Sequence, residues 1–208
     1  MLKGRDKEGC QAYGRGPTMN RGLVIAISGP PASGKTTHAK FIAKRFKLRY
    51  VSAGQLFRRL ASELGLSLEE FHKLAETDPK YDRLVDERSI EEAKKGNVVL
   101  EGHLTAWIVR KYADIAIYVK ASLEARAMRL AKRDGKSLEE AMNEIRVREE
   151  SNRQRYLKYY GIDIRDLTIF DLVIDTTYLE VNAVRHIIET YIKEYLKGKR
   201  AKLDVQST

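Results

Sequence analysis

The stretch Gly29-Pro30-Pro31-Ala32-Ser33-Gly34-Lys35-Thr36-Thr37 matches the pattern G-x-x-x-x-G-K-[ST]. The apolar run at residues 23–27, which precedes it, is typical of a strand buried on both faces. Residues 38–46, which follow it, carry apolar side chains at helical spacing. A phosphate-binding loop requires this order of strand, loop and helix, because the unpaired N–H groups and the dipole at the helix start both attract an anion. We therefore predict that residues 29–37 bind the phosphates of a nucleotide.

Two residues near the end of this stretch have specific roles in such a motif. Lys35 is expected to reach the β- and γ-phosphates, and the hydroxyl of Thr36 to ligate Mg²⁺. Gly29 and Gly34 are expected to allow backbone conformations and a close approach that a Cβ atom would hinder.

Outward from the loop, short apolar runs alternate with helical patterns. Strand-like runs lie at residues 23–27, 48–52, 97–102, 114–119 and 172–176. Residues 53–96 form a helical insert that contains no strand-like run. This alternation predicts an α/β fold in which helices cover both faces of a parallel sheet, with ligands at the carboxyl ends of its strands.

Local signals also predict where helices begin and end. Ser67 and Ser137 each precede a glutamate pair and mark helix starts, and Asp78-Pro79 marks another. The last helix is predicted at residues 179–196, with residues 198–208 as a basic tail. Residues 1–21 show no periodicity and are predicted to be a disordered extension.

Composition excludes several classes of protein. The 208 residues are 43% hydrophobic, with no apolar run long enough to span a bilayer and no secretory signal. The lone Cys10 excludes an intrachain disulfide and a cysteine-based zinc site, so we expect a cytoplasmic enzyme that uses no membrane. The net charge of +10 raises nucleic acid as a partner, but the sequence has no long basic block and no nucleic-acid-binding motif. We expect no nucleic-acid partner, and arginine pockets for polyphosphate explain part of the charge.

Basic side chains recur at helical spacing in two segments. Arg126, Arg129 and Arg133 share one helical face, and the helix that follows a turn at residues 134–136 carries a second such set. This second set consists of Arg148, Asn152 and Arg155. Such faces are either solvated surface or guanidiniums that converge on phosphate. Beside a phosphate-binding loop we favour the second interpretation, because phosphoryl transfer needs cations around both phosphates.

Four other residues keep two interpretations. Glu101, at the end of the third strand-like run, either holds a water of Mg²⁺ or caps the strand. His103 either binds phosphate or is structural. Trp107 and Phe57 are expected to pack in the core, with contact to a base as the alternative.

Several stretches together resemble archaeal-type cytidylate kinases over about residues 22–196. Specific among them are Ser52-Ala53-Gly54-Gln55-Leu56-Phe57-Arg58 and Arg155-Tyr156-x-x-Tyr159-Tyr160-Gly161-Ile162-Asp163. The resemblance implies transfer of the ATP γ-phosphate to CMP or dCMP with Mg²⁺, by a monomer. It also implies a three-layer P-loop fold with a five-stranded parallel sheet, a monophosphate-binding insert at about residues 53–96, and an arginine-bearing lid at about residues 130–150.

The resemblance also assigns site residues. The ATP-binding set is Gly29, Pro30, Pro31, Ala32, Ser33, Gly34, Lys35, Thr36, Thr37 and Arg129. The acceptor-binding set is Ser52, Gly54, Arg58, His103 and Asn152. The catalytic set is Lys35, Arg133, Arg148 and Arg155. The metal site consists of Thr36 and, through water, Glu101.

The sequence departs from the family pattern at Gln55, Ala32, Asn152 and His103, which affects the acceptor assignments more than the phosphate chemistry. One rival is another small-acceptor P-loop kinase, acting on UMP, AMP or a non-nucleotide such as shikimate. A guanine-nucleotide switch is excluded, because residues 114–121 contain no N/T-K-x-D stretch. A nucleotide-gated nucleic-acid binder is the third alternative.

Overall fold

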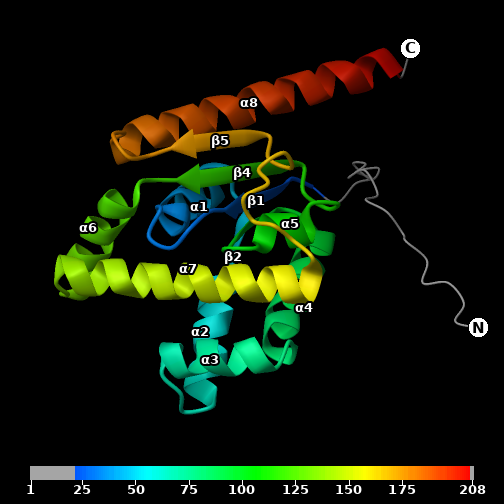
Figure 1. The fold of residues 1–208 in the computed structure, drawn as a ribbon. Helices are drawn as coiled ribbons and strands as arrows, with labels where there is room; N and C mark the ends of the chain where they lie inside the picture. The colour runs from blue at the N-terminus through cyan, green and yellow to red at the C-terminus, as the bar shows by residue number, and fades with distance from the viewer. Residues whose placement is uncertain (1–21, 207–208) are drawn as a thin grey trace, which may run out of the picture.

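In the computed structural model, which describes residues 22–206, five parallel strands form one sheet (Figure 1). They are β1 (Val24–Ser28), β2 (Arg49–Ser52), β3 (Val98–Glu101), β4 (Ile115–Lys120) and β5 (Leu172–Asp175). Their order across the sheet is β2-β3-β1-β4-β5, and each neighbouring pair is parallel. The predicted α/β class and the five predicted strands are confirmed. Because β1 is central, the loop that follows it emerges in the middle of the sheet's carboxyl edge.

Alternate side chains of β1 enter two different cores. Ile25 and Ile27 pack against α1 (Lys35–Arg45) and α8 (Val181–Gln206) on one face of the sheet. Val24 and Ala26 pack on the other face against residues of α4 (Lys80–Lys95) and α5 (Thr105–Val109). This burial on both faces explains the continuous apolar run in the sequence.

The remaining helices form two projections from the sheet. The first is the insert, in which α2 (Ala53–Glu63) and α3 (Leu68–Thr77) precede α4. The second is a hairpin of α6 (Leu123–Asp134) and α7 (Leu138–Tyr160), and α7 contacts both α6 and α3. Figure 1 shows α7 lying between the sheet and the helices α2 and α3. The hairpin and the insert are thus two arms over one edge of the sheet.

Most of the predicted helix boundaries are confirmed. Ser67 and Ser137 each form a capping box with the glutamate three residues later, and Gly96 ends α4. The helix α4 begins at Lys80 with Pro79 as its cap residue, although the Asp78 side chain still accepts from the Lys80 N–H at 2.9 Å.

The predicted end of the last helix, at residue 196, is wrong. The helix α8 continues to Gln206, so the basic stretch after residue 197 is helical up to that residue rather than a tail. A glycine in a helix costs only about 1 kcal/mol, so Gly198 does not end it. The Lys199 ammonium also donates to the Asp114 carboxylate at 2.8 Å, which anchors this part of α8 to the sheet.

The predicted disordered extension at residues 1–21 lies outside the described residues. Within the described ones, no helix combines the length and apolarity needed to cross a membrane. Trp107 packs edge-on against Phe170 and Tyr118, as expected of a core residue.

Candidate active site

The loop between β1 and α1 has the backbone that its sequence predicts. Gly29 and Gly34 have φ angles of 152° and 99°, and a Cβ on Gly29 would lie 2.0 Å from the carbonyl oxygen of Val119. Ala32 also has a positive φ, of 58°, although it carries a Cβ. The chain therefore holds a left-handed conformation at Ala32 that a glycine would adopt without strain.

Lys35 is the first residue of α1, and its side chain folds back onto the loop. Its Nζ atom donates to the carbonyl oxygen of Pro30 at 2.6 Å. Burial and, to a smaller extent, the nearby guanidiniums of Arg148 and Arg126 lower the pKa of Lys35 to about 8, although Glu101 opposes the shift. A cation in this position gains strongly from an incoming anion such as a phosphate.

Glu101 is the meeting point of three hydroxyl groups. Thr36, Ser52 and Tyr50 donate to its Oε1 atom at 3.1, 2.6 and 3.0 Å. The parallel register pairs Ser52 of β2 with Glu101 of β3, which explains why these strand ends share a hydrogen-bond network. Glu101 is 4% exposed, and a carboxylate buried to this degree needs such donors.

The pair of Thr36 and Glu101 is also the oxygen set that fits Mg²⁺, a cation that prefers carboxylate and hydroxyl oxygens and keeps several waters. Within residues 22–206, no group of three or more histidine, cysteine, aspartate or glutamate side chains could hold a metal ion. Thr36 and Glu101 by themselves would supply only part of a Mg²⁺ coordination shell.

The start of α2 brings Gly54 and Arg58 to the same edge. Ser52 caps this helix by accepting from the Gln55 N–H at 3.2 Å. A Cβ on Gly54 would lie 3.5 Å from the Arg58 guanidinium, and a Cβ on Gly102 would collide with Thr105 and Ala53. The strand end at Gly102 and the start of α2 thus approach closely.

The three arginines that share a face of α6 have three different environments. Arg126 is 7% exposed, pairs with Glu149 at 2.6 Å and donates to the Pro31 carbonyl, so it supports the phosphate loop from behind. Arg129 donates to Thr176 in the connection between β5 and α8. Arg133, at the end of α6, is exposed and pairs with Asp134.

The second set, on α7, faces the insert and the phosphate loop. The Nη1 atom of Arg148 donates to Glu144 at 3.1 Å, and burial lowers the pKa of Arg148. Asn152 bridges its neighbours, because its Oδ1 accepts from Arg155 at 2.8 Å and its Nδ2 lies 2.7 Å from His103 Nδ1. Since arginine can only donate, the Asn152 oxygen must face Arg155, and its NH₂ group donates to His103. Burial keeps the pKa of His103 well below its usual value, so the ring is neutral with its proton on Nε2.

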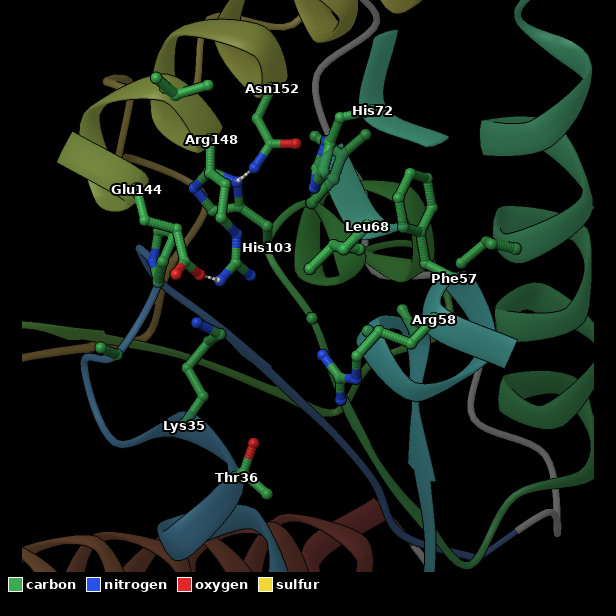
Figure 2. Close-up of a pocket in the computed structure, with 18 of the residues that line it drawn as sticks. Lys35, Thr36, Phe57, Arg58, Leu68, His72, His103, Glu144, Arg148 and Asn152 are labelled. Carbon is green, nitrogen blue, oxygen red and sulfur yellow. Dashed lines mark hydrogen bonds and ion pairs between the residues drawn. The ribbon is translucent and has the colours of Figure 1, made fainter. Parts of the chain in front are cut away.

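These elements enclose one cavity of about 930 Å³ (Figure 2). Twelve residues of the predicted site line it: Pro31, Ala32, Lys35, Thr36, Gly54, Arg58, Glu101, His103, Arg133, Arg148, Asn152 and Arg155. Seven predicted residues are not among the lining residues: Gly29, Pro30, Ser33, Gly34, Thr37, Ser52 and Arg129. In Figure 2 the cations of Lys35, Arg58 and Arg148 face a common space, with Thr36 beside it.

Sequence reasoning missed several lining side chains on α3, α4 and α7, among them His72, Asp82, Asp86 and Glu144. None of them lies in a motif. Helical periodicity could not identify them, because in a highly charged helix the local sequence does not distinguish a polar residue that lines a cavity from one that faces solvent.

Comparisons with known proteins agree with this geometry. A model of the cytidylate kinase-like family matches residues 24–178. A cytidylate kinase of Pyrobaculum arsenaticum is 61% identical over 164 residues, which are 78% of this chain and 89% of the relative. One of Staphylothermus marinus is 54% identical over 175 residues, covering 84% and 99% of the two chains. The solved shikimate kinase of Acinetobacter baumannii, in complex with shikimate, superposes with a TM-score of 0.55 at 17% identity over 85% of this chain and 94% of its own. This last likeness shows the fold alone.

Proposed function

Because this chain belongs to the cytidylate kinase-like family, we propose that it transfers the γ-phosphate of ATP to CMP or dCMP. The observation that carries the proposal is the shared cavity. Lys35 and Thr36 of the phosphate loop, Arg58 of the insert and Arg148 of the hairpin all line it. A donor phosphate on the loop and an acceptor phosphate near Arg58 would therefore face the same space.

On the donor side, residues 29–37 and the start of α1 bind the phosphates of ATP through the backbone N–H groups that all of them except Pro30 and Pro31 carry. Lys35 exchanges the Pro30 carbonyl for a phosphate oxygen, and Thr36 and Glu101 would hold Mg²⁺, the latter through water. When bound, the metal neutralises charge on the β- and γ-phosphates.

On the acceptor side, Arg58 pairs with the monophosphate while Gly54 lets the chain approach it closely. The neutral His103 offers its Nε2–H as a further donor, oriented by Asn152. Ser52 contributes indirectly, since its hydroxyl is engaged with Glu101 and with the cap of α2.

The chemistry is an in-line transfer without a covalent enzyme intermediate, in which the protein positions the two phosphates and stabilises the moving charge. Arg133 and Arg148 lie on the two helices of the α6–α7 hairpin, at about the residues predicted for the lid. We propose that this hairpin closes over ATP, so that both guanidiniums reach the transferred group and water is excluded. Arg129, bonded to the connection after β5, lies on the donor side of this lid.

An acceptor panel tests the proposal. The purified chain is assayed with ATP and Mg²⁺ against CMP, dCMP, UMP, AMP and shikimate, with Lys35→Met as the inactive control. We expect kcat/KM to be highest for CMP or dCMP. A preference for UMP, AMP or shikimate would replace the acceptor and keep the phosphate chemistry. Failure to bind ATP in the presence of Mg²⁺ would refute the whole proposal.

A further inference from the structure

The end of the cavity that lies away from the phosphate loop has an apolar wall and two polar side chains. Phe57, Leu68 and Val85 supply the wall, and His72 and Asp82 are the polar groups. Figure 2 shows Phe57, Leu68 and His72 together on the side opposite Lys35 and Thr36, with Arg58 between them. A monophosphate held at Arg58 would extend its base into this region.

Arg155 fixes both polar groups from behind. It is 2% exposed, and its Nε atom lies 2.9 Å from Asp82 Oδ2 while its Nη1 atom lies 3.0 Å from His72 Nδ1. Its third nitrogen donates to Asn152, and the Phe57 ring lies 5.5 Å from the guanidinium carbon. One planar guanidinium therefore contacts both a carboxylate and an imidazole.

The contact with Arg155 determines the proton on His72. Arginine donates and never accepts, so His72 Nδ1 is the acceptor. Burial and the Arg155 charge lower the pKa of His72 to about 3, which keeps the ring neutral. Its single proton is therefore on Nε2, and the ring presents an N–H donor to a ligand.

Asp82 presents a hydrogen-bond acceptor, whereas His72 presents a donor. Asp82 is 6% exposed and lines the cavity, and its Oδ2 atom is paired with Arg155 Nε at 2.9 Å, whereas no described residue donates a hydrogen bond to its Oδ1 atom. Burial raises the pKa of Asp82 while the guanidinium opposes that shift. A largely buried carboxylate with one oxygen that lacks a donor is costly, and a ligand N–H group would complete it at Oδ1.

We propose that Asp82 and His72 read the Watson–Crick edge of the acceptor base, Asp82 accepting from the 4-amino group of cytosine and His72 Nε2–H donating to N3. This inference rests on the proposed function. Uracil presents an oxygen at position 4 and a proton at N3, so both contacts would bring like groups together. CMP and dCMP share the same base and are not distinguished here. Arg155 is a positioning residue in this arrangement, since it acts through Asp82 and His72.

The test compares kcat/KM for CMP and UMP in the wild type and in Asp82→Asn. An asparagine amide can turn its oxygen to cytosine or its NH₂ group to uracil, so the variant loses the discrimination. A site built to bond a substrate N–H group rejects the analogue that lacks it by up to about 10⁴-fold, and we expect the CMP-to-UMP ratio to fall at least about 100-fold. Glu87→Gln, which neutralises an exposed carboxylate on the same helix, is the matched control and should leave the ratio unchanged.

His72→Gln is the second variant, because Asp82→Asn removes a charge from a buried ion pair and can fail to fold. Its amide also turns either way, so the ratio should fall here too. Circular dichroism at the assay temperature identifies any variant that is unfolded. Equal losses for CMP and UMP in the folded variants, with the ratio retained, would show a purely structural role and overturn the inference. A wild type that phosphorylates neither CMP nor dCMP would instead refute the proposed function.

Discussion

Replacing Lys35 by methionine should abolish activity and, at neutral pH, stabilise the fold. Burial lowers the pKa of Lys35 from 10.5 to about 8, so the folded protein holds this proton less tightly than the unfolded chain does. At 1.36 kcal/mol per pKa unit, the charged form would cost the folded state at most about 3 kcal/mol. Lys35 remains partly exposed, so solvent screens part of this cost. The variant also loses the hydrogen bond to Pro30, which contributes about 1 kcal/mol.

The net gain expected for Lys35→Met near pH 7 is therefore about 1 kcal/mol, or about 2–4 °C in Tm for a domain of this size. The stability difference between the variant and the wild type depends on pH. Below pH 8 the wild type bears the full penalty, and as pH rises from about 8 to about 10.5 the folded protein releases its proton and the penalty disappears. The stability advantage of the variant should shrink over the same range.

The assay is urea unfolding of both proteins, without nucleotide or metal, at about pH 7 and about pH 10. Lys44→Met, which removes an exposed lysine from the same helix, is the control and should change the unfolding free energy by less than about 0.5 kcal/mol at either pH. A variant that is less stable than the wild type near pH 7, or whose advantage does not depend on pH, would refute the reasoning. Retained phosphoryl transfer would refute the role of the residue.

Three further outcomes are expected. Ala32→Gly should leave the unfolding free energy unchanged or raise it by up to about 1 kcal/mol, because it removes a left-handed alanine. The control Ala39→Gly, inside α1, should lower the unfolding free energy. Equal losses for the two variants in urea unfolding would contradict this expectation. Arg148→Ala should lower kcat by at least about 100-fold with a smaller change in KM for ATP. The control Arg146→Ala, at an exposed position on α7, should leave kcat unchanged. An effect of Arg148→Ala on KM alone would argue against transition-state stabilisation. Burial raises the pKa of Asp86 to about 7, so the wild type loses stability as pH rises from about 4 to about 7. Asp86→Asn should therefore be more stable than the wild type by about 1–2 kcal/mol at about pH 8 but not at about pH 4. A stability advantage of equal size at both pH values, measured by urea unfolding, would contradict the assignment.

The sequence by itself determined the phosphate loop, the five strands and most helix boundaries. These features depend on contacts between near neighbours. A capping box such as that at Ser67 lies within four residues, and the double burial of β1 is visible in a run of five apolar residues. The sequence also indicated the unusual backbone conformations of Gly29 and Gly34, whose φ angles are positive.

The tertiary structure alone decided how distant side chains combine. Glu101 collects hydroxyls from Tyr50 and Ser52 because the register of β2 on β3 brings them together, about fifty residues apart in the chain. The arginines on one face of α6 separate into different environments, because the helix ends reach different parts of the protein. Asp82 and His72 meet only through Arg155, from a helix that follows them by more than seventy residues. Helical spacing specifies which side chains share a face, but packing between helices determines what that face contacts, and here packing determined which side chains line the end of the cavity away from the phosphate loop.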